Sequence, residues 1–129
     1  MPVHRFSHYN IRSDLSTIEA LRQFYVDVLS FRVGERPPFS SRGFWLYLGD
    51  LPVMHLVEGD PGDSRRARPD DLIDHVAFEC SDMPDFHRRL SKAGVSWDTT
   101  FVPGTSVVQL VFHDPAGNKV ELQFDEEKN

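Results

Sequence analysis

The pattern of hydrophobic and polar positions divides the first half of the chain into strands and one helix. Residues 3–11 alternate in character, as a strand exposed on one face does. A helix is indicated as far as about Leu29, because Ser16 and Glu19 form a capping-box pattern and apolar residues then recur at helical spacing. The β-prone segments that follow are residues 31–33, 44–48 and 53–58. The first half is therefore predicted to be βαβββ.

The second half repeats this order after a polar stretch. Residues 59–71 have little to bury and are expected to form an exposed linker. A strand at 72–80 precedes a helix that Asp82 opens and Gly94 closes. The remaining β-prone segments are residues 95–101, 107–112 and 120–124. The expected fold is α+β, a single domain over residues 1–129 in which two βαβββ modules, about 1–58 and 72–124, form one curved mixed sheet.

The last hairpin of the second module holds one carboxylate. Its turn, the segment DPAGN at 114–118, combines the residues that favour tight turns. Side chains alternate on the strand after the turn, so Val120, Leu122 and Phe124 share one face and Glu121 lies on the other. Glu121 is thus expected on rigid backbone just past a turn.

Equivalent positions of the two modules carry candidate metal ligands. His75 follows His8 by 67 residues, and Glu121 follows His55 by 66. If the modules pack side by side, these four side chains converge at one point. Imidazole and carboxylate together suit one divalent ion of zinc, nickel, iron or manganese. Each residue alone would be an ordinary histidine or surface acid, but their joint register favours a metal site enclosed by the sheet.

Composition limits the classes of function. At 129 residues, 40% hydrophobic and 26% charged, the chain has the composition of one ordinary globular domain. Its net charge of -6 gives no electrostatic footprint for nucleic acid, and no apolar run reaches the length of a membrane span. Cys80 is the only cysteine, which excludes an internal disulfide and, with no signal-peptide pattern at the start, favours a cytoplasmic protein.

Four segments together resemble the vicinal oxygen chelate superfamily. They are HYNIRSDLSTIEALRQFYVDVLSF, LPVMHLVE, DHVAFEC and HDPAGNKVEL. This superfamily includes glyoxalase I, extradiol dioxygenases, fosfomycin-resistance proteins, methylmalonyl-CoA epimerase and metal-free bleomycin-binding proteins. The resemblance covers nearly the whole chain. One departure is Ser30, where members commonly carry a helix-ending glycine.

The resemblance implies a ligand set and a leading activity. His8, His75 and Glu121 match the superfamily's metal ligands, and His55 takes a fourth place. Arg12 matches an arginine that holds the glutathione carboxylate in glyoxalase I. The implied activity is glyoxalase-like lyase or isomerase chemistry on a small substrate with adjacent oxygens. Glu121, or a water held by it, would transfer the proton, and His55 would be either a ligand or an acid–base group.

Two other classes remain open on the sequence. In an iron-dependent extradiol dioxygenase, His8, His75 and Glu121 would form the iron triad and His55 would shuttle protons, although Val111 stands where those enzymes have a tyrosine. A metal-free drug-binding protein is the third possibility, and such members generally lack the ligand set.

The two modules can close the site either within one chain or between two chains, and a homodimer is expected because the resemblance implies that modules of small members commonly pair across subunits. His8 and His55 of one chain would then meet His75 and Glu121 of the other.

Overall fold

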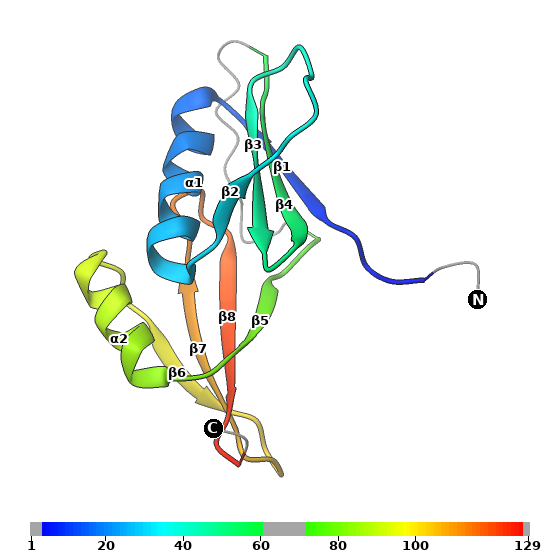
Figure 1. Ribbon diagram of the computed structural model, residues 1–129. Coiled ribbons are helices and arrows are strands. Elements are labelled where there is room, and N and C mark those ends of the chain that lie inside the picture. Colours follow the sequence, from blue (N-terminus) through cyan, green and yellow to red (C-terminus); the bar gives the residue numbers. More distant parts are fainter. Residues whose placement is uncertain (1–3, 61–71, 128–129) are drawn as a thin grey trace. The chain divides into compact units, whose positions relative to one another are not determined.

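The structure, a computed structural model, describes residues 4–60 and 72–127. The chain divides into an N-terminal unit, Met1–Arg65, and a C-terminal unit, Arg66–Asn129. Each unit is built in the same order of one strand, one helix and three strands (Figure 1). The two predicted βαβββ modules are therefore confirmed. Beyond Asp60, the expected linker at 59–71 lies outside the described residues.

The N-terminal unit is a four-stranded mixed sheet with one helix. Its strands lie in the order β1-β4-β3-β2. β1 pairs with β4 in parallel, and the other two pairs are antiparallel. The elements are β1 (Tyr9–Ser13), α1 (Leu15–Leu29), β2 (Arg32–Gly34), β3 (Gly43–Leu48) and β4 (Leu51–Glu58).

The C-terminal unit repeats this topology with the order β5-β8-β7-β6. β5 is parallel to β8, as β1 is to β4. The elements are β5 (Val76–Cys80), α2 (Met83–Lys92), β6 (Asp98–Phe101), β7 (Val107–His113) and β8 (Lys119–Asp125). The described hydrogen-bond ladders thus form one sheet per unit, and the prediction of one continuous sheet is corrected to two four-stranded sheets.

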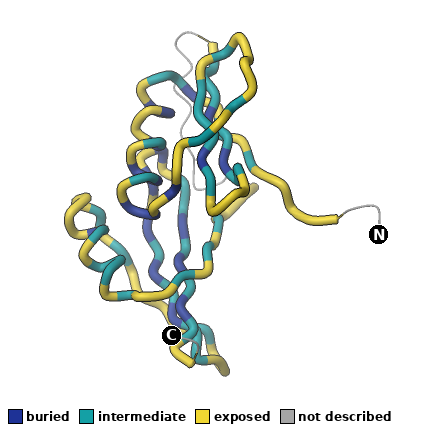
Figure 2. The backbone as a smooth tube through the Cα atoms, viewed as in Figure 1, coloured by how far each residue is buried: buried dark blue, intermediate teal, exposed yellow. Residues whose placement is uncertain are grey.

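Alternation along the strands gives each sheet one apolar face and one mixed face. In β4, Met54 and Leu56 are fully buried, and α1 packs on this strand. His55, between them, points to the opposite face. In β8, Phe124 is fully buried against the ring of Phe86 from α2, with centroids 5.7 Å apart. Figure 2 shows the buried positions following the strands of both sheets.

The helix starts are set by aspartates. Asp14 is the N-cap of α1, and its side chain accepts a hydrogen bond from the backbone N–H of Thr17. Asp82 caps α2 in the same way, accepting from Asp85. The predicted capping box of Ser16 and Glu19 is wrong, because α1 has already begun at Leu15.

Neither helix in the described part of the chain is long and apolar enough to cross a bilayer. A spanning helix needs about 20 apolar residues, and α1, the longer of the two, has 15.

The end of α1 requires an unusual backbone conformation at Ser30. Its φ and ψ are 59° and 30°, in the left-handed region, and its N–H donates to the carbonyl of Tyr25. The N–H of Phe31 donates to the same carbonyl at 3.0 Å. Left-handed backbone costs a non-glycine residue free energy because of its Cβ. Ser30 therefore occupies the position that helices most often give to glycine.

We expect Ser30→Gly to raise the free energy of unfolding by about 0.5–1 kcal/mol, because the strain removed exceeds the added entropy of the unfolded chain. Urea unfolding followed by circular dichroism measures the change. The matched control is Ala20→Gly in the middle of the same helix, which should lower stability by about 1 kcal/mol. A loss of stability in both proteins would contradict this account of Ser30.

Candidate functional site

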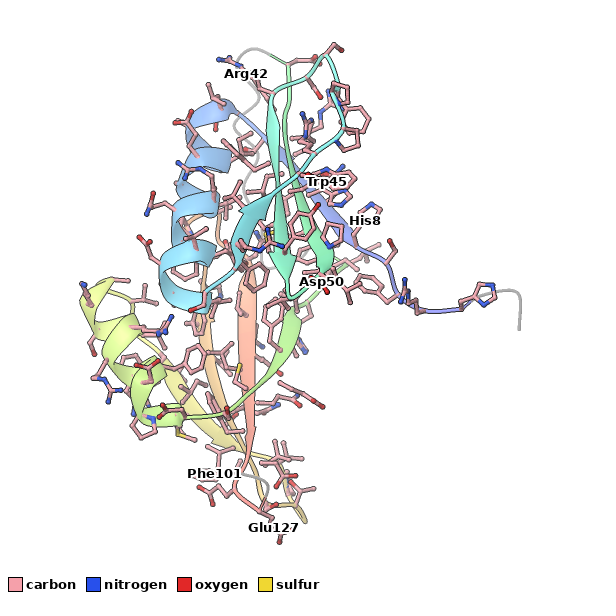
Figure 3. The ribbon with its side chains drawn as sticks, viewed as in Figure 1. His8, Arg42, Trp45, Asp50, Phe101 and Glu127 are labelled. Atoms are coloured by element: carbon pink, nitrogen blue, oxygen red, sulfur yellow. The ribbon has the colours of Figure 1, made fainter. Side chains whose placement is uncertain are left out.

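The N-terminal unit brings together His8 and His55. Their rings stack in parallel, with centroids 3.8 Å apart and an interplanar angle of 13°. The ring of Trp45 covers the other face of His55, at 4.0 Å and 10°. Figure 3 shows His8 and Trp45 close together beside the sheet, on the side away from α1. The result is a stack of three rings with His55 in the middle.

Hydrogen bonding and burial give His55 a defined chemical state. Its Nε2 donates to the carbonyl oxygen of Pro52 at 3.0 Å, so the lone pair of the neutral ring lies on Nδ1. Burial, and secondarily the electrostatic interaction with His8, lowers the pKa of His55 below its ordinary value. His55 is consequently neutral at neutral pH, which is the form that binds a metal ion.

The C-terminal unit brings together His75 and Glu121. The Nε2 atom of His75 lies 3.5 Å from Oε2 of Glu121, and their side chains are 37% and 12% exposed. The expected position of Glu121 is confirmed, because Val120 and Leu122 on either side of it are fully buried. A carboxylate and an imidazole therefore share the mixed face of this sheet.

The neighbour of His75 determines which of its nitrogens carries the proton. Nδ1 of His75 lies 2.8 Å from Oδ2 of Asp74. This hydrogen bond, together with Lys119 at 3.5 Å, lowers the pKa of the Asp74 carboxyl, so Asp74 is ionised and can only accept. A proton shared with Asp74 therefore lies on Nδ1 of His75, and the other ring nitrogen, Nε2, faces Glu121 and carries the lone pair in the neutral form of the ring.

Two acceptor atoms that face each other without a donor between them repel. Two ligand atoms about 2.0–2.2 Å from a tetrahedral metal lie roughly 3.4 Å apart, close to the 3.5 Å between His75 Nε2 and Glu121 Oε2. The pair therefore has the donor chemistry and the spacing that a divalent cation fits.

The stacked pair of the N-terminal unit has a different geometry. Two imidazoles on one tetrahedral metal would have ring centroids roughly 5 Å apart, more than the 3.8 Å between His8 and His55. His8 is exposed and lies outside β1. Its ring can therefore turn away from the stack, whereas His55 is held by Trp45 and Pro52.

The two pairs occupy equivalent places in the two sheets. His8 lies two residues before Asn10, the register partner of His55. His75 lies two residues before Ala77, the register partner of Glu121. Both histidines were predicted inside strands, and the structure instead leaves each one residue before its strand. The repeat read from the sequence is thus present as a repeat of geometry.

The four candidate residues form two pairs, one in each unit. Among residues 4–60 and 72–127, no group of three or more His, Cys, Asp or Glu side chains is placed to hold a metal ion. The enclosed four-residue site expected from the sequence therefore stays a prediction.

Two further residues, Arg12 and Cys80, could take part in binding or chemistry. Arg12 is half-exposed, and its guanidinium lies 3.8 Å from the carboxylate of Asp60. An exposed ion pair of this length is weak, so Arg12 remains accessible to an anion. Burial raises the pKa of the Cys80 thiol to about 11, so Cys80 stays protonated and is a poor nucleophile or ligand at neutral pH.

Comparison with known proteins identifies the class. Residues 5–122 match the Glyoxalase/Bleomycin resistance protein/Dioxygenase superfamily, and the chain belongs to it. Glyoxylase I 4 of Arabidopsis thaliana is 27% identical over 125 residues, covering 94% of this chain and 72% of that protein.

Solved structures confirm the fold. A glyoxylase/bleomycin resistance protein/dioxygenase domain from Frankia sp. EAN1pec has a TM-score of 0.78 at 20% identity, covering 98% of this chain and 96% of that one. A mutant of the fosfomycin resistance protein FosX from Listeria monocytogenes, complexed with Mn(II) and 1S,2S-dihydroxypropylphosphonic acid, has a TM-score of 0.75 at 15% identity, covering 98% and 95%.

Three contacts at these pairs were missed by sequence reasoning. Trp45 is the register partner of His55 across the β3–β4 hairpin and stacks on it. Asp74 adjoins His75 in the sequence, which was the available signal. Gln109 gave none, because it reaches Glu121 diagonally across two strands.

Proposed function

We propose that this protein is a metal-dependent enzyme with glyoxalase I-like lyase or isomerase chemistry, acting on a small substrate with two adjacent oxygens. The observation that carries the proposal is the pair formed by His75 Nε2 and Glu121 Oε2, two facing acceptors 3.5 Å apart. The likeness of the chain to Glyoxylase I 4 supports the same class. The equivalent pair, His8 and His55, would supply the remaining ligands.

Each residue has a role in this proposal. A divalent ion, when bound, would polarise the substrate oxygens and stabilise negative charge on them. Glu121 would take a proton from the carbon beside one oxygen and return it to the neighbouring carbon. Gln109, whose Nε2 donates to Glu121 Oε2 at 3.1 Å, would keep that carboxylate in one orientation. Among the candidate metals zinc, nickel, iron and manganese, the likeness to FosX supports manganese, since a FosX mutant has been crystallised with Mn(II).

The ring stack would form one wall of the substrate site. Trp45 and Pro52 fix His55, so the wall is rigid on that side, whereas exposed His8 would turn toward the ion. Arg12 would hold an anionic group of the substrate, because its contact with Asp60 is long and exposed.

We also propose that the working form is a homodimer. His8 and His55 of one chain would act together with His75 and Glu121 of the other. Each unit carries one complete pair on its own sheet, so a site needs one N-terminal and one C-terminal unit but not two from the same chain.

An extradiol dioxygenase is the second candidate, favoured by one observation. His55 is neutral, half-buried and hydrogen-bonded to Pro52, as a proton shuttle beside a three-residue iron site would be. In that case His55→Ala would retain metal and lose ring cleavage, whereas a lyase-type site would lose metal affinity.

The test is metal analysis of protein purified without chelators, followed by assays with hemithioacetals and with catechols. We expect one divalent ion per pair of units and isomerisation of a hemithioacetal that chelator abolishes and added metal restores. His113→Ala, which alters an exposed histidine at the end of β7, serves as the control and should keep full activity. Catechol cleavage with oxygen uptake, and no conversion of hemithioacetal, would reverse the order of the two candidates.

A further inference from the structure

Asp74 is an exposed residue whose carboxylate nevertheless contacts two side chains. Its Oδ2 accepts from Nδ1 of His75 at 2.8 Å and lies 3.5 Å from Nζ of Lys119. The side chain is 72% exposed. An exposed carboxylate contributes little to stability through such contacts. The contact with His75 does, however, determine where the imidazole proton sits and which way the ring faces.

A second chain of hydrogen bonds ends on Glu121. The hydroxyl of Thr100 donates to Oε1 of Gln109 at 3.0 Å. Because this fixes the amide orientation, Nε2 of Gln109 points to Oε2 of Glu121, at 3.1 Å. Thr100 and Gln109 are register partners on β6 and β7, so both ends of this chain rest on strands. Glu121 is thereby prevented from rotating away from His75.

We propose that Asp74 and Gln109 are positioning residues that orient the two metal-ligand atoms of the C-terminal unit. Asp74 keeps the His75 proton on Nδ1 and so leaves Nε2 as the ligand atom. Gln109, aligned by Thr100, directs Oε2 of Glu121 at the same point. The inference rests on the proposed metal-dependent function and adds residues outside its ligand set.

The arrangement has a general physical reason. A histidine ligand normally donates its second N–H to a carboxylate or carbonyl, and removing that partner costs 10- to 100-fold in metal affinity. A neutral histidine without such a partner exchanges its proton between the two nitrogens, and each molecule with the proton on Nε2 cannot use that atom as a ligand. A residue that holds the proton on the other nitrogen therefore raises metal affinity, because it increases the fraction of molecules in which the ligand nitrogen has a free lone pair.

The first experiment compares Asp74→Ala and Asp74→Asn with the unmodified chain. Asp74→Ala should bind Mn²⁺ about 10- to 100-fold more weakly in an EPR titration, and Asp74→Asn, which keeps an acceptor oxygen, should recover part of this loss. In the metal-free protein, ¹⁵N NMR of the imidazole should show the His75 proton on Nδ1, moving toward an exchange between both nitrogens in Asp74→Ala. The His75 signals are assigned by their loss in His75→Ala.

Matched variants separate positioning from general surface charge. Glu79→Ala removes another exposed carboxylate from β5, and Lys119→Met removes the second partner of Asp74. Neither should change Mn²⁺ affinity more than about threefold. Gln109→Ala should weaken Mn²⁺ binding about 10-fold or more. Gln123 is the register partner of Gln109 on β8, and Gln123→Ala should leave Mn²⁺ binding unchanged.

The outcomes distinguish this inference from the function on which it rests. Unchanged affinity and an unchanged His75 proton position in Asp74→Ala, with normal binding by the unmodified chain, would overturn the positioning role alone. Equal losses in Lys119→Met and Asp74→Ala would also overturn it, since charge rather than orientation would then be responsible. No measurable binding of Mn²⁺ or Zn²⁺ by the unmodified chain would overturn the proposed function and the positioning role together.

Discussion

His8→Ala and His75→Ala proteins are expected to bind Mn²⁺ or Zn²⁺ more than about 100-fold more weakly than the unmodified chain. This loss exceeds the 10- to 100-fold loss of metal affinity that is typical when a residue hydrogen-bonded to a ligand is removed. Each change removes one imidazole nitrogen from a small ligand set. The folds should stay intact, because His8 and His75 lie outside the strands and are exposed. Isothermal titration with metal, together with circular dichroism, checks both expectations.

His113→Ala is the control for these losses, because it also removes an exposed imidazole. It should bind metal like the unmodified chain. Unchanged affinity in both His8→Ala and His75→Ala would show that the two units do not share a metal site.

Mixing His8→Ala with Glu121→Ala proteins tests how the units combine. If the site joins units of different chains, subunit exchange should restore one intact site in each heterodimer, and metal binding should reappear. Exchange demonstrated by native mass spectrometry without any recovery of binding would mean that each site is built within one chain.

Asp114→Ala is expected to produce the largest loss of stability, about 3 kcal/mol or more. Asp114 is only 5% exposed, and its Oδ1 accepts from the backbone N–H groups of Ala116 and Asn118, each at 2.9 Å. Its Oδ2 accepts from the side-chain amide of Asn118, also at 2.9 Å. Each buried donor left without an acceptor costs about 1–3 kcal/mol. Urea unfolding, with an unchanged denaturant slope, measures the effect.

Two comparisons make the Asp114 prediction specific. Asp114→Asn places an amide N–H₂ against Asn118 but keeps one acceptor oxygen for the backbone N–H groups. Because it keeps that acceptor, it should lose less stability than Asp114→Ala. Asp50→Ala changes an exposed aspartate in the β3–β4 turn of the other unit and should stay within about 0.5 kcal/mol of the parent. Equal stability of Asp114→Ala and Asp50→Ala would contradict the importance of this turn network.

The topology and the equivalent positions of the candidate residues could be predicted from the sequence, because both rest on periodicity. Apolar alternation requires Glu121 to face away from Val120 and Leu122, and the structure agrees. The spacing of His8 and His55 equals that of His75 and Glu121 within one residue, and the two pairs occupy equivalent registers. These features follow from the alternation of side chains along a strand and from the repeat of the two modules.

The features that the sequence did not predict depend on which of several similar local conformations the rest of the fold favours. Ser16 with Glu19 and Asp14 are both plausible helix starts, and the structure has Asp14 as the N-cap, with its side chain accepting from the N–H of Thr17. The strand limits near His8 and His75 depend on where pairing with the neighbouring strand begins, which periodicity does not encode. Gln109 reaches Glu121 only because of the tilt between paired strands, so composition gives no indication of it.

In the proposed metal site, the facing atoms of His75 and Glu121 would also couple metal binding to the stability of the fold. Without a cation, two facing acceptor atoms would repel each other and lower the stability of the folded state, and an ion bound between them would remove that cost. By mass action, metal at 100 times its dissociation constant would stabilise the folded form by about 2.7 kcal/mol. A thermal-shift series across divalent ions would therefore rank the candidate metals by their effect on the melting temperature before any substrate is known.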